Sequence, residues 1–488
     1  MSATNAYALT VLLVAGAGLL AVASNRITER LKVPTPALVL IAAALAVAFV
    51  PGIEHPQERP VEGIVTLALT FILFDGGMHI GWRRFRSAAK PIAIVGVVGT
   101  LATAIGAAAL LHFAFSVPWY LAVLVATAVA PTDPAIVFSV LGKREIAGRS
   151  STILEGESGA NDPVGIALMG ALLAAGELSS SAFVGVGVQF FLQMVIGGLV
   201  GYVGGRLLLW FMRAAPLPSE ALYPLRTLMA VPILYAVATL AQGSGFLAVF
   251  VAGIYLGDAR TPYKVEIERF HAAVASLAEI VAFVVLGLTV DVGQLLHPDV
   301  WVTGLVLAVG MSFVIRPLAV GLCLNGSRLH NNEKAFVLFA GLKGAVPILL
   351  AELLRAADVP NVERWYGVIV VVVVFSVLFQ GTLTPYVAAA LRLPMRTIEP
   401  EPWAAGVRLR DEPEGVHQFR VRANSLADGR QLSDLDTLGE RFWISFIVRD
   451  RQLVKITGDT HLRAGDEVLA MVDPADIPAL NRYFRDTQ

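Results

Sequence analysis

Long apolar runs, separated by short polar or Gly/Pro-rich breaks, fill the chain up to about residue 391. Several exceed the roughly 20 residues that a helix needs to cross the hydrocarbon core of a bilayer. Cutting the chain at the breaks gives about thirteen segments, near 7–24, 34–51, 61–80, 91–113, 118–141, 151–175, 182–212, 222–241, 244–257, 273–292, 299–324, 335–354 and 366–391. The pattern predicts an all-α polytopic membrane protein, in which the first segment is a retained helix.

Composition agrees with this prediction. Hydrophobic residues make up 56% of the chain and charged residues only 15%, whereas about 25% of the residues of a soluble domain are charged. The formal net charge of −1 gives no reason to expect a nucleic-acid partner, and membrane lipid is the expected surrounding.

Basic residues are distributed very unequally between alternate loops, which predicts the orientation of the chain. One set of loops contains only Arg59, Arg355 and Arg364, and the other contains groups such as Arg83, Arg84, Arg86 and Lys90. Loops rich in Lys and Arg remain on the cytoplasmic side. We therefore expect a multi-pass protein of the cell membrane with its N-terminus outside and its C-terminus in the cytoplasm.

The composition changes after the last apolar segment. Residues 392–415 are rich in Pro, Arg and Glu and are typical of a linker between the transmembrane domain, residues 1–391, and a third part, residues 416–488. Strand-like runs at 442–448 and 468–472 and a helical pattern at 474–484 predict a small cytoplasmic α+β domain. Its length is short for an independent core, so pairing with a second copy is expected.

Two spans contain residues that interrupt a helix near mid-membrane. Segment 118–141 includes Ala130-Pro131-Thr132-Asp133-Pro134, and segment 335–354 includes Gly341-Leu342-Lys343-Gly344-Ala345-Val346-Pro347. Proline removes backbone hydrogen bonds and kinks or unwinds a helix. The two spans are seven apart in order and so run in opposite directions. This predicts two broken helices that cross within an inverted repeat, as in secondary transporters.

Asp162 is the acid with the strongest claim to a function. The triplet Asn161-Asp162-Pro163 lies in a span, where a carboxylate is costly and normally faces a protein interior or a watery cavity. Its carboxyl group can bind a proton or a dehydrated monovalent cation, but not both, which is sufficient for an exchanger. The alternative is a buried acid that bridges helices. The hypothetical site consists of Asp162, Asp133, Ser158 and the side chain or carbonyl of Thr132.

The other charges in the spans are expected to be structural. Either Arg316 or Lys343 could pair with Glu157 and so lower the cost of both charges. Lys343 is expected either to neutralise half-helix dipoles at the crossing or to pair with an acid. For Asp75 and Glu279 we favour interhelical hydrogen bonds over a part in transport.

Together these elements resemble the monovalent cation:proton antiporter family, in its sodium/proton or potassium/proton branch with a single core aspartate. The resemblance covers about residues 7–391 and rests on Thr132-Asp133-Pro134, Glu157-Ser158-Gly159-Ala160-Asn161-Asp162-Pro163, Arg316-Pro317 and Gly341-Leu342-Lys343-Gly344. It implies a homodimer in which a core bundle moves like an elevator against a dimerisation bundle. It also implies a carrier, Asp162, for Na⁺ or K⁺ and H⁺ in turn, ligands at Thr132 and Ser158, and a core held together by Glu157, Asn161 and Arg316.

The resemblance extends to stoichiometry. Asn-Asp in place of the Asp-Asp of electrogenic relatives implies electroneutral one-for-one exchange, and no cofactor is implied. The family usually has Arg where this chain has Lys343, and a lysine cannot make a bidentate contact. The partner of Lys343 is therefore not fixed by the resemblance.

The tail resembles TrkA-C domains, the C-terminal half of potassium-transport regulatory domains. The resemblance rests on Ser425-x-x-x-Gly429, Ile444-x-x-Ile447-x-Arg449 and Leu462-x-x-Gly465-Asp466. No Gly-x-Gly-x-x-Gly follows a strand, so the nucleotide-binding half is absent. The resemblance implies a dimeric regulatory module that responds to pH or to a small-molecule or nucleotide ligand.

Two other classes of function fit the pattern less well. A cation channel with a cytoplasmic regulatory domain would need a continuous pore, whereas paired broken helices around a protonatable acid favour alternating access. An intramembrane enzyme would need a nucleophile–base pair or a metal set, which the apolar spans lack, so we predict no enzymatic activity. The sequence leaves Na⁺ and K⁺ both open.

Overall fold

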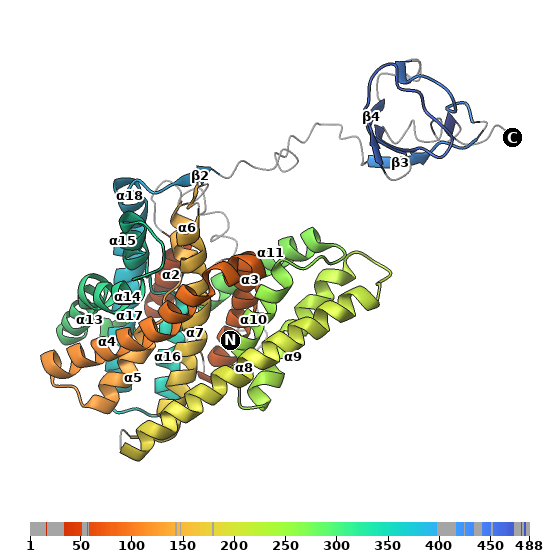
Figure 1. Cartoon of the computed structure of the whole chain (residues 1–488). Helices are drawn as coiled ribbons and strands as arrows, with labels where there is room; N and C mark the ends of the chain where they lie inside the picture. The colour runs from red at the N-terminus through yellow and green to blue at the C-terminus, as the bar shows by residue number, and fades with distance from the viewer. Residues whose placement is uncertain are drawn as a thin grey trace. The chain divides into compact units, whose positions relative to one another are not determined.

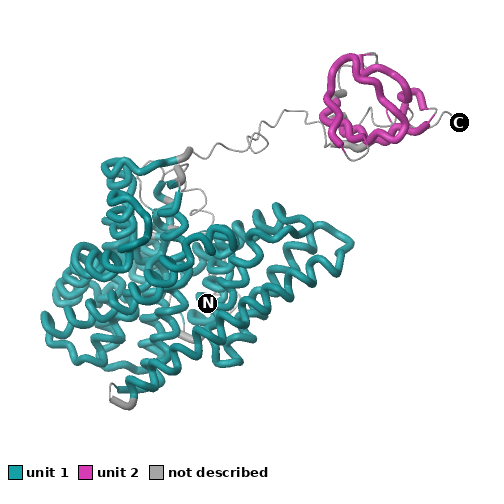
Figure 2. Tube along the Cα trace, viewed as in Figure 1, with its two compact units in different colours: residues 1–398 teal, residues 399–488 magenta. Residues whose placement is uncertain are grey.

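The chain forms two compact units, residues 1–398 and 399–488 (Figure 2). The computed structural model describes residues 34–50, 56, 58–141, 144–146, 148–177, 180–397, 416–423, 425–433, 442–449 and 452–472, together with residues 16, 480, 483 and 484. The described part of the first unit is almost entirely helical, and that of the second consists mainly of strands (Figure 1).

Helices of the first unit follow the predicted apolar segments. Those up to residue 288 are α2 (Thr35–Phe49), α3 (Glu58–Ala93), the π-helical η1 (Ile94–Gly99), α4 (Thr100–Phe115), α5 (Trp119–Val129), α6 (Ala135–Leu141), α7 (Arg149–Ala175), α8 (Ser180–Ala214), α9 (Leu222–Leu240), α10 (Gly245–Gly257) and α11 (Lys264–Leu288). The remainder are α12 (Val292–Leu295), α13 (Pro298–Gly310), the π-helical η2 (Met311–Ile315), α14 (Arg316–Cys323), α15 (Asn331–Phe339), α16 (Ala345–Ala356), α17 (Val362–Phe375), the π-helical η3 (Ser376–Gly381) and α18 (Thr382–Ala390).

These helices confirm a mostly helical membrane fold. Every predicted segment from 34–51 onward overlaps helices, and the predicted segment 7–24 lies outside the described residues except for Gly16. Within the described part of the chain, six helical stretches are long and apolar enough to cross a membrane, and three shorter apolar helices accompany them.

Two predicted boundaries differ from the structure for the same reason. The charged stretch between segments 61–80 and 91–113 is helical, and the break lies at one residue, Gly81, whose φ of 66° turns the chain. Helix α11 likewise begins at Lys264 and not near 273. Charged residues mark the end of an apolar run, but a helix continues through them where its backbone hydrogen bonds can still form.

Helix α3 contacts α10 at the level of the backbone. A Cβ atom added to Gly77 would lie 2.4 Å from the carbonyl oxygen of Phe250, and one added to Gly253 would lie 2.3 Å from that of Phe74. Glycine is therefore required at both positions for the two helices to approach so closely. This contact fixes the first half of α3 against α10, and both helices contribute to the wall of the cavity described below.

The second unit contains a four-stranded antiparallel sheet in the order β3-β6-β4-β5. Its strands are β3 (Val416–Arg420), β4 (Phe442–Arg449), β5 (Gln452–Val454) and β6 (Glu467–Val472). The strand-like runs predicted at 442–448 and 468–472 coincide with β4 and β6, whereas the helix predicted at 474–484 lies mostly outside the described residues. A separate two-stranded pair in the first unit joins β1 (Arg144–Ile146) to β2 (Met395–Thr397).

One ion pair with a buried carboxylate connects β4 to the turn before β6. The side chain of Arg449 donates to Asp466 Oδ1 and Oδ2, each at 2.8 Å, and the backbone N–H of Arg463 donates to Oδ2 at 2.9 Å. Burial alone would raise the pKa of Asp466, but the hydrogen bonds from Arg449 and Arg463 outweigh it and lower the pKa below its ordinary value.

Because the pKa of Asp466 is lower in the folded unit, its contribution to stability is present above the unfolded value of about 3.9 and is lost as the pH falls through the folded value. We expect backbone amides of β4 and β6 to lose protection from hydrogen exchange in acid, after correction for the intrinsic rate. The D466N variant should already have lost much of this protection at pH 7. Equal protection of wild type and D466N at pH 7 would contradict the role given to this pair.

Candidate cation site

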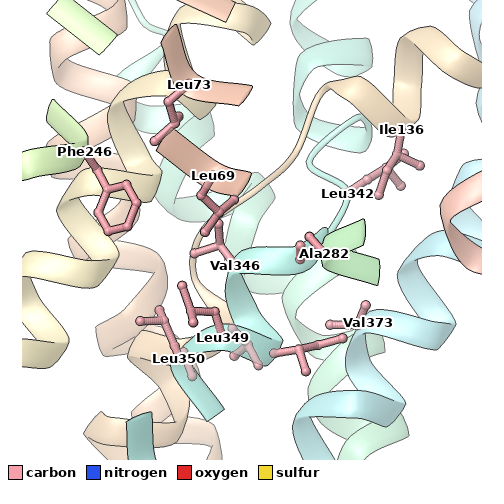
Figure 3. Packing of buried hydrophobic residues seen from close by; sticks show 14 of the residues in the cluster. Leu69, Leu73, Ile136, Phe246, Ala282, Leu342, Val346, Leu349, Leu350 and Val373 are labelled. Carbon is pink, nitrogen blue, oxygen red and sulfur yellow. The ribbon is translucent and has the colours of Figure 1, made fainter. Parts of the chain in front are cut away.

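The two predicted helix breaks are present and meet each other. Helix α5 ends at Val129 and α6 begins at Ala135, while α15 ends at Phe339 and α16 begins at Ala345. The backbone N–H of Asp133 donates to the carbonyl oxygen of Leu342 at 2.7 Å, which joins the two non-helical segments directly. Buried apolar side chains surround them (Figure 3), including Ile136, Leu342, Val346 and Leu349.

Lys343 binds the end of the opposite half-helix. Its ammonium group donates to the carbonyl oxygens of Ala130 at 2.8 Å and Pro131 at 3.1 Å, and only 4% of the residue is exposed. Carbonyls at a helix C-terminus carry a partial negative charge. Of the two roles expected for Lys343, the observed contacts correspond to neutralisation of a half-helix dipole.

Glycines allow the second break to pack against charged side chains. A Cβ atom on Gly341 would lie 2.0 Å from Arg316 Nε, and one on Gly344 would lie 2.1 Å from Asp133 Oδ2. No side chain could be added at either position without moving a charged group of the site.

Glu157 pairs with Arg316 and not with Lys343. The guanidinium of Arg316 makes two bonds to the carboxylate, at 2.7 and 3.1 Å, and the two side chains are 2% and 5% exposed. Arg316 also donates to the carbonyls of Leu338 and Val337, in the last turn of α15. One guanidinium thus neutralises a buried acid and caps a broken helix.

Asn161 orients the first break. Its Nδ2 atom donates to Thr132 Oγ1 at 2.7 Å, and both residues are buried. The hydroxyl of Thr132 therefore lies against Asn161, and Thr132 is not among the residues that line the cavity described below.

Asp162 lines a cavity of about 490 Å³, together with Ser158 and Asp133. This volume is far above the roughly 15 Å³ needed for one water. Only 8% of Asp162 is exposed. Within the described part of the chain its carboxylate has no hydrogen bond or ion pair, and Asp133 and Lys343 are the charged groups whose fields act on it most. The structure therefore brings Asp133, Ser158 and Asp162 together around one accessible space.

The same cavity extends toward the end of α3 that carries the basic helical stretch after Gly81. His79, Arg84 and Glu155 line it there, and Asp75 and Glu279 line its walls. One oxygen each of Asp75 and Glu279 is buried and has no hydrogen-bond partner among the described residues. Asp75 forms an ion pair with His79, at 3.3 Å within the same helix. No interhelical hydrogen bond of the expected kind is found for these two acids in the described part of the chain.

Sequence reasoning missed two residues that contact the second break. Ser376 and Gln380, in η3, are buried and bond to the segment around Lys343. Their spacing of four residues on an apolar span was the available signal, because buried polar groups at that spacing share a helix face.

The two parts of the chain match two different families of known proteins. The model of the family described as "Sodium/hydrogen exchanger, transmembrane" matches residues 16–390, and that of the TrkA-C domain matches residues 416–485. Both matches confirm the resemblances predicted from the motifs.

Named relatives align over nearly the whole chain. The K⁺/H⁺ antiporter NhaP of Alkalimonas amylolytica is 32% identical over 478 residues, which cover 97% of this chain and 83% of that protein. The K⁺/H⁺ antiporter NhaP2 of Shewanella sp. strain MR-4 is 31% identical over 469 residues, covering 94% and 80%.

A solved structure has the same fold. The sodium proton antiporter MjNhaP1 of Methanocaldococcus jannaschii, solved at pH 8, superimposes with a TM-score of 0.67 at 23% identity and covers 78% of this chain and 100% of its own. With a family match over residues 16–390 and relatives more than 30% identical along almost its entire length, this chain belongs to the sodium/hydrogen exchanger family.

Proposed function

We propose that this chain exchanges a monovalent cation for H⁺ across a membrane and that Asp162 binds both in turn. The observation that carries the proposal is the Asp162 carboxylate, which is buried, lines the cavity and has no hydrogen bond or ion pair with any described residue. A bare charge in a low-dielectric interior is costly. This cost is removed when the carboxylate binds either a proton or a cation.

The proposed cation ligands come from the first break and from α7. Carboxylate oxygens of Asp162 and Asp133, the hydroxyl of Ser158 and the carbonyl of Thr132 are hard oxygen donors, the ligand type that alkali cations need. Asn161 holds Thr132 in place through its 2.7 Å hydrogen bond. The cation is cargo and leaves when a proton takes its position on Asp162.

Charge balance favours electroneutral exchange. Arg316 neutralises Glu157, and Lys343 remains bonded to the carbonyls of Ala130 and Pro131. Asp162 is followed by proline and preceded by the neutral Asn161, so one acid carries one positive charge in each direction. One cation is then exchanged for one proton.

Alternating access follows from the position of the cavity. It reaches Asp162 from the end that carries Arg84, which the distribution of basic residues assigns to the cytoplasm. We propose that this is the inward-facing state, with the C-terminus also cytoplasmic. An elevator movement of the core bundle, within a homodimer like that implied by the family resemblance, would present Asp162 to the other side.

Potassium is the cation we propose first. The two relatives above are named as K⁺/H⁺ antiporters, and the TrkA-C match supports the choice through the resemblance of such domains to parts of potassium-transport regulatory domains. Exchange measured with Li⁺, Na⁺, K⁺ and Rb⁺ in turn tests this choice. A cation channel, the alternative function, is not favoured by the named relatives and would give currents that follow the membrane potential.

D162N removes the only proposed proton carrier and is expected to reduce cation-driven proton movement to the level of empty vesicles. The measurement is the change of a pH dye in proteoliposomes after addition of KCl, repeated at different clamped membrane potentials. D258N is the matched control. Asp258 accepts the backbone N–H of Arg83 at 2.6 Å, a bond that asparagine can also accept, and it does not line the cavity. Exchange retained by D162N would refute the proposal.

E157Q is expected to lower the free energy of unfolding by about 3–5 kcal/mol, because it leaves the buried guanidinium of Arg316 without its counter-charge. The double variant E157Q/R316Q should recover part of this loss. The measurement is denaturant unfolding of purified protein. D299N is the control, since Asp299 and Arg364 form an exposed pair and such pairs contribute roughly 0–1 kcal/mol. An equal effect of E157Q and D299N would show that the buried pair has no structural role.

Deletion of residues 405–488 tests regulation by the tail. Because the two compact units divide at residue 398, the transmembrane unit should remain folded and exchange should persist. We expect the dependence of exchange on pH or on cation concentration to shift. D466N, which weakens the tail in place, should shift it in the same direction. Identical profiles for full-length and truncated protein would argue against a regulatory tail.

A further inference from the structure

Two buried polar side chains in the last span have no part in the exchange step proposed above. Ser376 and Gln380 are each only 2% exposed, although they lie between the apolar helices α17 and α18. Polar groups within a membrane span are costly unless they are satisfied and usually have a function.

The pair connects both ends of the second helix break. The backbone N–H of Lys343 donates to Ser376 Oγ at 2.9 Å, and this hydroxyl donates to Gln380 Oε1, also at 2.9 Å. Gln380 Nε2 then donates to the carbonyl oxygen of Phe339, the last residue of α15, at 3.4 Å. One continuous chain of hydrogen bonds thus reaches from the end of α15 to the residue that binds the first break.

The segment held in this way carries the contacts that define the cation site. Leu342 accepts from the backbone of Asp133, and the ammonium of Lys343 binds the carbonyls of Ala130 and Pro131. Asp133 and Lys343 are the charged groups whose fields act most strongly on Asp162. A displacement of this segment would therefore change the electrostatic field at Asp162 without a direct contact to its carboxylate.

The local backbone indicates that the arrangement is specific. Ser376–Gly381 is π-helical, and π-helical turns inside α-helices occur frequently at functional sites. Among the described residues there are two further π-helical segments, and both also adjoin the site. In η1, a Cβ atom on Gly96 would lie 2.6 Å from Ala160, the residue before Asn161, and η2 ends directly before Arg316.

We propose that Ser376 and Gln380 are positioning residues for the cation site. They hold the segment Gly341–Gly344, and through it Lys343 and Asp133, in the arrangement in which Asp162 exchanges its ions. The inference rests on the proposed function, because it assigns these residues a role in the affinity of the same site.

The test separates affinity from folding. In proteoliposomes with a pH dye, S376A and Q380M should raise the KCl concentration for half-maximal exchange by about 3- to 10-fold. This is the change expected if the loss of one buried hydrogen bond weakens cation binding at the site by a similar free energy. The maximal rate at saturating KCl and the melting temperature should change little. S376T, which keeps the hydroxyl, should restore the wild-type value.

T384V is the matched control. Thr384 is buried in the same span and donates to the carbonyl of Gln380 within its own helix, but it makes no bond to the break. Unchanged half-saturation in S376A and Q380M, or an equal rise in T384V, would overturn the inference. If S376A does not fold, the half-saturation values of Q380M and S376T test the inference. If only this inference is wrong, the wild-type protein still exchanges cations for protons and D162N still does not. If the proposed function is wrong, wild-type exchange is absent or D162N retains it.

Discussion

Backbone groups freed by two broken helices, away from water, are the constraint on which the rest of the structure depends. Each free N–H or carbonyl must find a partner inside the protein. The carbonyls at the end of α5 are bound by Lys343, the N–H of Asp133 by Leu342, and the carbonyls at the end of α15 by Arg316 and Gln380. The breaks are therefore bonded to each other, to Arg316 and to the last span.

The same constraint separates fixed charges from the exchangeable one. Arg316 and Lys343 each have backbone carbonyls as partners, and Glu157 is fully paired with Arg316. These groups hold the scaffold, and none of them forms a hydrogen bond or ion pair with Asp162 in the described part of the chain. A cationic side chain bonded directly to Asp162 would compete with every transported ion, so the placement of Lys343 on carbonyls is a requirement of the proposed exchange and not only a means of capping a helix.

Local signals in the sequence predicted the parts that depend on local chemistry. Proline and glycine clusters gave the breaks after α5 and α15, and apolar runs gave the spans. The charged stretch after Gly81 was expected to be a loop, because composition reports a change of environment and not the end of a helix. The partner of Glu157 was left open, since Arg316 and Lys343 are far away in sequence and their choice depends on the crossing geometry. Ser376 and Gln380 were missed for the same reason.

A carrier built in this way has an intrinsic protection against leakage. If Asp162 crossed the membrane ionised and empty, its charge would be moved through a low-dielectric interior, at an effective cost of several kcal/mol. About 4 kcal/mol slows a step roughly 10³-fold. With a proton or a cation bound, this cost disappears, and the two loaded forms cross with the same charge. In the proposed mechanism, the coupling of cation to proton therefore requires no gate that recognises either ion. It follows from one carboxylate that has no partner among the described residues, beside basic groups that are already occupied.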